Sequence, residues 1–415
     1  MGCCDTKGLM PIEQALSKMQ EAVTNVCQPI NLPLADALGY ALASDVLSPL
    51  NVPPFNNSAM DGYGVKREDL EGADKQNPLS LTLVGQSFAG APYQGNVATG
   101  ECIRIMTGAV MPSCVDSVVM QERITLNDDQ VIFTQVPKLG DNVRLVAEDL
   151  QLGQCVLKKG HKLSARDIPL LASLGLAEVS VFRALKVAVL SSGDELKNVG
   201  ETLLEGEIYD SNRYSIIALL SRLNVEILDF GIIRDDRTLI REALLRADEQ
   251  ADVVITSGGV SVGDADFIKE VLTEIGTIGF WKLAIKPGKP FAFGKLGSSV
   301  FFGLPGNPVS AMVTLYQLAV PTMATLAGFK IKPALRLKAK CTTFVKKSPG
   351  RTDFQRAIHT VDDNGQLIVQ TTGSQGSGVF SSMSQSNCFM VLEEQRGDVL
   401  EGETVMIEPY NALMD

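Results

Sequence analysis

The chain is poor in the residues that build zinc sites and nucleophilic triads. It has only two histidines, His161 and His359, and none of its eight cysteines forms a Cys-x-x-Cys pair. A structural zinc site needs Cys or His ligands at short spacings, and a nucleophilic triad needs a histidine beside the nucleophile. Both interpretations are therefore disfavoured, and the cysteines are expected to be reduced thiols.

A net positive charge and the common nucleotide-binding fingerprints are also missing. A net charge of -11 and a pI near 4.9 argue against nucleic-acid binding, which requires a broad basic face. No Gly-x-Gly-x-x-Gly follows a strand, and there is no Walker A sequence. The sequence therefore predicts that any anion site is a local basic patch in an acidic protein.

The chain has little that suggests a membrane or a secretory route. No stretch is expected to be long and apolar enough to span a bilayer, and the start has no basic region followed by an apolar core. The expectation is a cytoplasmic protein with no membrane partner. The start Met1-Gly-Cys-Cys-Asp-Thr6 fits the short pattern for N-myristoylation, but a ragged, unstructured end is the favoured interpretation.

The pattern of apolar residues predicts several kinds of domain. Helices are expected at residues 11–26 and 34–44, followed by a β-rich region. From Ala184 strands and helices alternate, which predicts a parallel-type sheet covered by helices on both faces. A long helix at residues 308–326 ends this part, and a β-rich, barrel-like part follows. The fold class is therefore multidomain α/β.

Carboxylates are expected to gather at one edge of the α/β sheet, because ligands bind outside the carboxyl ends of parallel strands. Three predicted strands are followed there by acids, and the third also by glycines: Asp194, Glu195, Asp235, Asp236, Asp264, Asp266, Gly258, Gly259 and Gly263. Crowded carboxylates repel one another unless a cation lies between them, and Mg²⁺ favours carboxylates together with phosphate oxygens. Any one of these acids alone is interpreted as a solvated loop residue, but the set predicts a Mg²⁺-phosphate site.

A second stretch concentrates positive charge. Lys282, Lys286 and Lys289 occur with no acid among them, and prolines and glycines keep this segment out of a helix. Shortly afterwards Asn307 is a candidate N-cap and Pro308 a candidate first helical residue. Rigid cations beside the free N–H groups of a helix start would suit a small oxyanion. Lys282 alone is also compatible with an ordinary surface lysine.

Six motifs in this order resemble those of the molybdopterin molybdenumtransferase (MoeA) family, which includes the E domain of gephyrin. They are Asn57-Ser-Ala-Met-Asp-Gly-Tyr63, Arg104-Ile-Met-Thr-Gly108, Ser192-Gly-Asp-Glu195, Ser257-Gly-Gly-Val-Ser-Val-Gly263, Lys286-Pro-Gly-Lys-Pro290 and Leu304-Pro-Gly-Asn-Pro-Val-Ser310. The resemblance runs from about residue 8 to the end.

The resemblance implies a homodimer of four-domain subunits. The domains would be an elongated helical linker domain (8–50 with 144–182), a β-rich domain (51–143), an α/β domain that binds the pterin-nucleotide (183–328) and a C-terminal β-barrel domain (329–415). It implies insertion of molybdenum from molybdate into molybdopterin, with Mg²⁺-dependent hydrolysis of adenylated molybdopterin to AMP. The adenylating enzyme of the same pathway would be a further partner.

The resemblance also implies roles for residues that match its motifs. Catalytic residues would be Asp61, Thr107, Glu195, Asp235 and Asp266, of which the last three would also hold the metal. Substrate-binding residues would be Arg144, Asp149, Gly258, Gly259, Ser261, Lys282, Lys286, Lys289, Pro305, Pro308, Ser310, Arg356 and Ser377. The stretch Arg144-Leu-Val-Ala-Glu-Asp149 departs from the family pattern, which has a glycine before the Glu-Asp pair and extra arginines, so a weaker basic contact is expected there.

Two other functions are compatible with these motifs. One is a scaffold, because the gephyrin branch of the family clusters membrane receptors. The other is a pterin- or nucleotide-binding module without turnover. Release of AMP from adenylated molybdopterin, with and without molybdate, distinguishes such a module from the enzyme.

Overall fold

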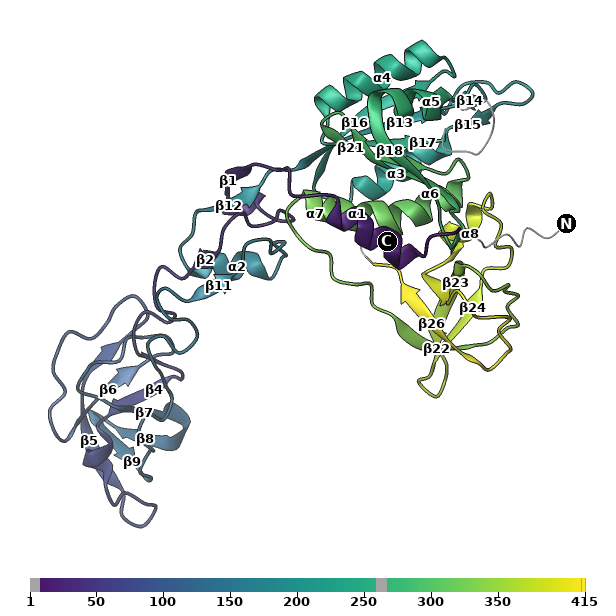
Figure 1. Ribbon diagram of the computed structural model, residues 1–415. Coiled ribbons are helices and arrows are strands. Elements are labelled where there is room, and N and C mark those ends of the chain that lie inside the picture. Colours follow the sequence, from purple (N-terminus) through teal and green to yellow (C-terminus); the bar gives the residue numbers. More distant parts are fainter. Residues whose placement is uncertain (1–7, 259–266, 412, 415) are drawn as a thin grey trace. The chain divides into compact units, whose positions relative to one another are not determined.

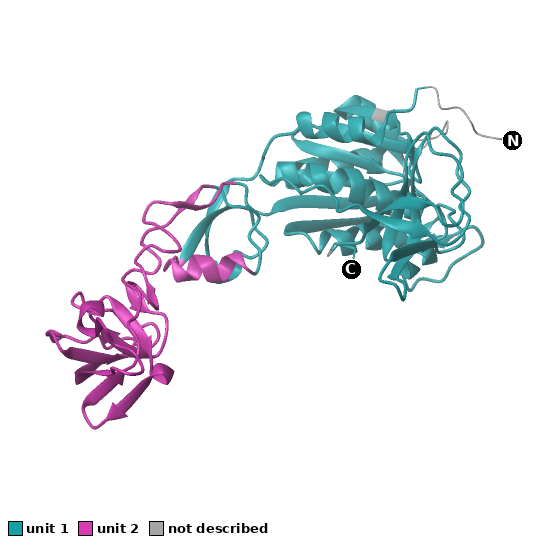
Figure 2. Ribbon diagram, turned by 90° about the horizontal axis from the view of Figure 1, so that it is seen from below, with its two compact units in different colours: residues 1–43, 160–165, 178–415 teal, residues 44–159, 166–177 magenta. Residues whose placement is uncertain are grey.

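The computed structural model describes residues 8–258, 267–411, 413 and 414. The chain forms two compact units, which Figure 2 colours separately. Unit 1 comprises Met1–Ala43, Gly160–Ala165 and Glu178–Asp415, and unit 2 comprises Ser44–Lys159 and Arg166–Ala177. The finer division into four domains stays a prediction.

A six-stranded sheet forms the centre of unit 1, with strand order β16-β13-β17-β21-β20-β18 (Figure 1). The first four strands run parallel, whereas β20 is antiparallel to β21 and β18 is antiparallel to β20. The bounds are Val225–Ile233 for β16, Leu185–Ser192 for β13, Val253–Ser257 for β17, Ser299–Leu304 for β21, Pro290–Leu296 for β20 and Gly276–Lys282 for β18.

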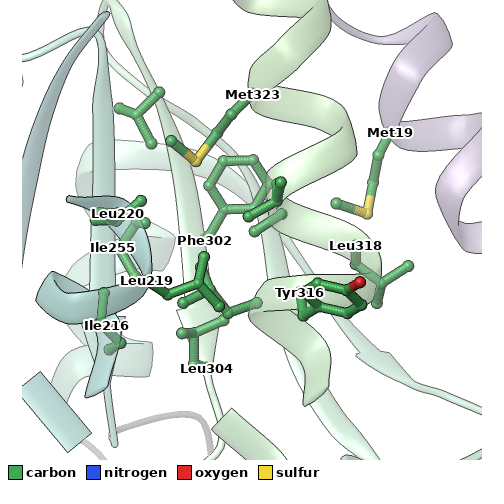
Figure 3. Packing of buried hydrophobic residues seen from close by; sticks show 14 of the residues in the cluster. Met19, Ile216, Leu219, Leu220, Ile255, Phe302, Leu304, Tyr316, Leu318 and Met323 are labelled. Atoms are coloured by element: carbon green, nitrogen blue, oxygen red, sulfur yellow. The ribbon is translucent and has the colours of Figure 1, made fainter. Parts of the chain in front are cut away.

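Helices cover both faces of this sheet because successive strand residues point to opposite sides. On β13, Val187 and Val189 pack in the larger core cluster, whereas Ala188 and Leu190 pack in a second cluster on the other face. The larger cluster also takes residues from α1 (Ile12–Glu21), α3 (Ser211–Leu220), α6 (Pro308–Thr314), the π-helical turn η4 (Leu315–Ala319) and α7 (Val320–Leu326). The second cluster takes residues from α4 (Arg237–Gln250) and α5 (Phe267–Ile275). Figure 3 shows Met19 of α1, Ile216 of α3 and Met323 of α7 around Phe302 in the larger cluster.

The helix at Pro308–Leu326 requires a correction to the sequence analysis. Its length and mean hydropathy of 1.3 meet the requirements of a membrane-spanning helix, contrary to the expectation that no stretch would. However, 78% of the apolar window is buried inside the protein, as is typical of a core helix. Pro308 is its first residue and Asn307 precedes it, as predicted, although the Asn307 side chain makes no capping hydrogen bond.

A closed five-stranded barrel forms the C-terminal part of unit 1 (Figure 1). Its sheet has the order β19-β23-β24-β22-β26-β25, and an additional pairing of β23 with β25 closes it. The strands are β22 (Leu337–Cys341), β23 (Thr352–Val361), β24 (Leu367–Thr371), β25 (Cys388–Leu392) and β26 (Thr404–Pro409), with helix α8 (Ser381–Gln385) between β24 and β25. The added strand β19 (Ile285–Lys286) comes from the α/β part of the chain, so it joins the barrel to that part.

The helix expected at residues 34–44 is wrong. Only a 3-10 turn forms there (Leu34–Asp36), and the chain then turns at Gly39, whose φ is +85°. Ala41 and Leu42 instead make bridges with Lys162 and Val181. These long-range pairings, next to the antiparallel pair β1 (Pro29–Pro33) and β12 (Glu178–Phe182), outweigh the helical spacing of the apolar residues.

Unit 2 contains a six-stranded sheet with the order β7-β4-β6-β5-β9-β8. Its strands are β4 (Gly62–Val65), β5 (Leu79–Ser87), β6 (Glu101–Ile105), β7 (Ser117–Met120), β8 (Ile124–Asn127) and β9 (Gln130–Phe133). Two short antiparallel pairs accompany it: β3 (Asn57–Ser58) with β10 (Val143–Arg144), and β2 (Val46–Leu47) with β11 (Cys155–Leu157). Helix α2 (Asp167–Ser173) belongs to the same unit.

Candidate functional site

One edge of the central sheet of unit 1 collects the loops that carry the predicted site residues. The strands β16, β13, β17 and β21 all end at this edge because they run parallel. Strand β18 ends there too, since two antiparallel steps separate it from β21, and β20 begins there. The acids follow β13 and β16, and the lysines lie at the end of β18 and the start of β20.

The acidic end of the edge is organised by hydrogen bonds between neighbouring loops. The Ser192 hydroxyl donates a short hydrogen bond to the Asp235 carboxylate, and the Asp235 amide donates to Asp194 Oδ1 at 3.1 Å. The Glu195 carboxylate lies against Gly193, where a Cβ atom would come within 2.6 Å of Glu195 Oε2. Glu195 and Asp235 thus present oxygen ligands from adjacent strands.

Asp236 caps a helix, although the sequence analysis grouped it with the candidate metal-binding acids. Its carboxylate accepts hydrogen bonds from the amides of Thr238 and Leu239, at 2.8 and 3.0 Å, and so caps the start of α4. An aspartate at this position satisfies N–H groups that have no partner within the helix. Asp236 is therefore committed to the helix and less available to a ligand than Asp235.

Asn212, which the sequence analysis missed, ties together the loops at the middle of the edge. Its side-chain nitrogen donates to Ser257 Oγ and to the carbonyl oxygen of Gly306, both at 2.8 Å. Gly258 then turns with φ of +87°, and a Cβ there would lie 3.0 Å from the Ser192 carbonyl oxygen. Asp210 caps the same helix α3 through the Arg213 amide. An aspartate followed by Ser-Asn at a helix start was the available sequence signal.

Three predicted residues, Gly259, Ser261 and Asp266, lie outside the described residues. Within the described ranges, no group of three His, Cys, Asp or Glu side chains is arranged to hold a metal ion. The donors that are described at the acidic end, the Glu195 and Asp235 carboxylates, are hard oxygen ligands of the kind that Mg²⁺ prefers. Their chemistry fits Mg²⁺, with the third predicted ligand, Asp266, beyond what is described.

The three predicted lysines lie close together at the other end of the edge. Lys282 ends β18 and is exposed, whereas Lys286 and Lys289 are half-buried. The turn between them is held in place: the Leu283 amide donates to the Lys289 carbonyl oxygen at 2.7 Å, and Gly288 has φ of +116°. Neighbouring strands are about 4.8 Å apart, so the three steps from β13 to β20 span roughly 14 Å. Among the described residues, the acids after β13 and β16 and the lysines share one edge but do not form a single cluster.

Lys286 also lies at the joint with the barrel. It pairs with Asp353 of β23, with Nζ 3.4 Å from Oδ2. Beside this pair is an open pocket of about 360 Å³, whose polar lining includes Lys286, Lys346, Gln355 and Gln375. The two ammonium groups and the Gln355 amide are suited to a small oxyanion, whereas the Gln375 amide already donates to the Arg356 carbonyl oxygen at 3.1 Å and to the Gly373 carbonyl oxygen at 3.3 Å. Lys346 and the two glutamines were not singled out from the sequence.

Arg356 is buried and makes hydrogen bonds within the barrel part of the chain. It is 1% exposed, its Nε donates to Ser382 Oγ at 3.0 Å and its Nη2 donates to the Gly376 carbonyl oxygen at 3.1 Å. Its amide donates to Gln375 Oε1 at 2.8 Å. Burial lowers the pKa of this guanidinium from its ordinary value. Arg356 thus holds the loop at residues 373–377, which lines the pocket.

The same loop contacts the start of α6. The Val309 amide donates to the Ser377 carbonyl oxygen at 3.1 Å. The expected free N–H groups at this helix start are therefore fewer than predicted, since Pro308 has none and Val309 uses its own. Ser310 is 4% exposed, and Pro305 and Pro308 flank the turn that leads into the helix. These residues shape the edge near the lysines.

In unit 2, two of the predicted catalytic residues are in direct contact. Asp61 Oδ1 accepts hydrogen bonds from both the amide and the hydroxyl of Thr107, each at 2.8 Å. These bonds, the amide first, lower the pKa of Asp61 from its ordinary value. A Cβ on the adjacent Gly62 would overlap the Val119 carbonyl oxygen, which explains the glycine.

The other two predicted residues of unit 2 lie on its short strands and bridges. Arg144 is exposed and pairs with Asn57 in the β3–β10 ladder. Asp149 is exposed, and its amide donates to the Val52 carbonyl oxygen at 2.9 Å.

Comparison with known proteins matches almost the whole chain. Family models match in sequence order: the MoeA N-terminal region (domain I and II) at residues 10–175, a probable molybdopterin binding domain at 188–325 and the MoeA C-terminal region (domain IV) at 338–410. The molybdopterin molybdenumtransferase of Haemophilus influenzae is 50% identical over 408 residues, which cover 98% of this chain and 100% of that protein. The chain belongs to the MoeA family.

Two further relatives show how much of the chain the similarity covers. The crystal structure of a molybdopterin biosynthesis MoeA protein from Pyrococcus horikoshii OT3 superimposes with a TM-score of 0.84 at 28% identity, covering 97% of this chain and 100% of that one. Gephyrin of Dictyostelium discoideum is 30% identical, over 97% of this chain and 63% of that protein. The resemblance inferred from the six motifs is confirmed, and so is the multidomain α/β fold.

Proposed function

We propose that this chain is a molybdopterin molybdenumtransferase that acts on adenylated molybdopterin and molybdate and releases AMP in a Mg²⁺-dependent step. The observation that carries the proposal is the arrangement of the sheet edge in a chain half identical to such an enzyme. Carboxylates follow β13 and β16, and lysines lie at β18 and β20 of the same edge.

The acidic end is the place for the phosphate chemistry. Hydrolysis breaks the anhydride bond of adenylated molybdopterin, and water supplies the oxygen and the protons of the two products. Bound by Glu195, Asp235 and Asp266, Mg²⁺ would neutralise the phosphate charge and lower the pKa of a water ligand. Ser192 fixes the Asp235 carboxylate. Asn212 holds the loops after β17 and β21 together, and Gly258 leaves space beside the Ser192 carbonyl oxygen.

The lysine end is the place for the anions. Lys282 and Lys289, on the edge itself, would bind anionic groups of the pterin substrate. Lys286, which also lines the pocket at the barrel joint, would bind molybdate together with Lys346 and Gln355. Arg356 and Ser377 would act by holding the loop at 373–377 in place, because the guanidinium and the Ser377 carbonyl are engaged within the protein. Ser310, Pro305 and Pro308 would shape the adjoining turn.

Unit 2 would contribute to catalysis through a homodimer. Asp61 and Thr107 form a rigid acceptor-donor pair. We assign them, with Arg144 and Asp149, to the pterin-nucleotide site of the other subunit. The adenylating enzyme of the pathway is the proposed source of the substrate, and the cytoplasm is the proposed location of the reaction.

The experiment that tests the proposal is an AMP-release assay with purified protein, adenylated molybdopterin, Mg²⁺ and molybdate. We expect AMP release that chelation of Mg²⁺ abolishes. Asp235→Asn should lower the rate by about 100-fold or more, since it removes a ligand charge at the reacting phosphate. Substrate binding without AMP release would identify a binding module and overturn the proposed enzyme.

A further inference from the structure

The pairing of Lys286 with Asp353 is fixed by the backbone. In the short parallel ladder between β19 and β23, Lys286 lies opposite Asp353 and Ile285 lies opposite Thr352. The Thr352 amide also donates to the Ala284 carbonyl oxygen at 2.8 Å. The two side chains therefore meet because of strand register, and neither can leave the other without a rotamer change.

The two partners differ greatly in exposure. The Lys286 side chain is 43% exposed, whereas the Asp353 side chain is 2% exposed. The carboxylate accepts two long hydrogen bonds, from Lys286 Nζ at 3.4 Å and from Gln355 Nε2 at 3.4 Å, compared with about 2.8 Å for an optimal charge-assisted hydrogen bond. Asp353 is thus a buried carboxylate next to Lys286, whose side chain still lines the pocket.

Lys347, which follows the pocket residue Lys346, cannot take the place of Lys286. Lys347 is 3% exposed, and its Nζ donates to the carbonyl oxygens of Ser348, Arg351 and Glu394 at 3.2, 2.9 and 3.4 Å. These three bonds use all three donors of its ammonium. Lys347 attracts Asp353 at longer range but is committed to the backbone, whereas Lys286 keeps donors that an oxyanion in the pocket can accept.

We propose that Asp353 is a positioning residue that tunes the oxyanion affinity of this pocket by competing with the anion for Lys286. The carboxylate keeps the ammonium at the pocket, and it repels an incoming anion and shares the same donor. The repulsion and the competition for the donor both weaken anion binding. The bound anion should therefore dissociate more readily than it would without Asp353. The inference rests on the proposed function only in taking molybdate as the anion.

The test is a double-mutant cycle with sodium molybdate, measured by calorimetry on the full chain. Asp353→Asn should bind molybdate about fivefold more tightly, the effect expected for a half-exposed ion pair near 1 kcal/mol. Lys286→Ala should bind weakly, and adding Asp353→Asn to it should recover little of the affinity. Glu401→Gln, which removes an exposed charge from the turn before β26, is the matched control and should change nothing.

Several outcomes overturn the inference. Unchanged or weaker molybdate binding by Asp353→Asn contradicts it, as does a gain that persists in full without Lys286. Asp353→Ser is the second variant, in case the amide disturbs the ladder. If neither variant folds, as judged by circular dichroism and thermal unfolding, Asp353 is a structural counter-ion and the inference fails.

A kinetic readout separates this inference from the proposed function. Asp353→Asn should lower the KM for molybdate in the AMP-release assay without raising kcat, a change that a purely structural defect would not produce. A wild-type protein that binds molybdate but releases no AMP would refute the proposed function. The binding cycle would still decide the role of Asp353.

Discussion

Asp61 Oδ1 accepts two hydrogen bonds from one residue, Thr107, through its backbone amide and its hydroxyl. The two residues are 46 positions apart, and β4 and β6, which pair in the unit 2 sheet, bring them together. Both bonds favour the ionised carboxylate, so Asp61 is held as a charged acceptor in a fixed orientation.

Thr107→Val removes the hydroxyl bond but keeps the amide bond. We expect the pKa of Asp61 to rise part of the way towards its ordinary value, because the amide is the larger cause of its depression. AMP release should fall roughly tenfold or more, as for loss of one hydrogen bond to a charged group. NMR titration of the Asp61 carboxyl carbon measures the first effect. A pKa identical to that of the wild type would show that the hydroxyl does not matter. Thr125→Val, which changes an exposed threonine of β8 in the same way, is the control.

The lysines at the sheet edge should contribute unequally to oxyanion binding. Lys286→Ala is expected to weaken molybdate binding about tenfold or more, the value of one charge-assisted hydrogen bond. Lys282→Ala should weaken it by less than about threefold, because Lys282 is exposed and does not line the pocket. Calorimetry on both variants gives the comparison, and equal losses would contradict the order.

Gly288 is required by space as well as by conformation. A Cβ at this position would lie 2.6 Å from Thr314 Cγ2 of α6, and φ is +116°. Gly288→Ala should reduce the free energy of unfolding by about 2–3 kcal/mol, from overpacking and backbone strain together.

A second substitution separates these two causes. Thr314→Ser removes Cγ2 and keeps the hydroxyl that donates to the Ser310 carbonyl oxygen at 2.8 Å. In the Gly288→Ala background it should restore part of the stability in urea unfolding, while the strain from φ remains. If the effects of the two substitutions on the free energy of unfolding simply add, the methyl contact does not contribute to the loss.

Asp252 should make the stability of unit 1 sensitive to acid. Its carboxylate accepts bonds from Arg183 Nη1 and Nη2, at 2.7 and 2.8 Å, and from the Lys186 amide at 2.9 Å. Burial acts to raise the pKa of Asp252, but these donors outweigh it and hold the pKa below its ordinary value. A carboxyl with a lower pKa in the folded state stabilises the protein above the pKa of the unfolded chain, and this is lost as pH falls through the folded-state pKa.

Asp252→Asn is therefore expected to cost about 1–3 kcal/mol at pH 7 and less as the pH falls towards the folded-state pKa. Urea unfolding of both proteins between pH 7 and pH 3 measures this difference. If the free energies of unfolding of the two proteins differ by the same amount at every pH in this range, the expectation is wrong. Glu226→Gln breaks the exposed pair with Lys186, 3.6 Å apart, and should change stability by less than about 1 kcal/mol at any of these pH values.

Local sequence patterns predicted much of the α/β part. The alternation of strands and helices after Ala184 and the helix start at Pro308 were predicted, because apolar runs and proline act within a few residues. The pattern failed at residues 34–44, where apolar spacing suggested a helix but pairing with distant segments formed extended bridges. It also gave no bounds for β18 and β20, since glycine and proline in that stretch indicated only extended and turn backbone.

The candidate site likewise combines features that could be predicted from the sequence with features that could not. Which acids follow which strand could be predicted, and so could the stiff turn at Lys286-Pro-Gly-Lys-Pro290. The use of Asp236 as a helix cap, the bridging by Asn212 and the engagement of Arg356 within the barrel could not. Each depends on partners supplied by a distant segment.

By itself the sequence determined the chemical groups available to this protein and the family to which they belong. Only the tertiary structure decided their distribution, with acids at one end of a sheet edge, lysines at the other, and Lys286 beside an aspartate 67 residues away. The physical reason is that strand order and register arise from hydrogen bonds between remote segments, which local periodicity does not encode.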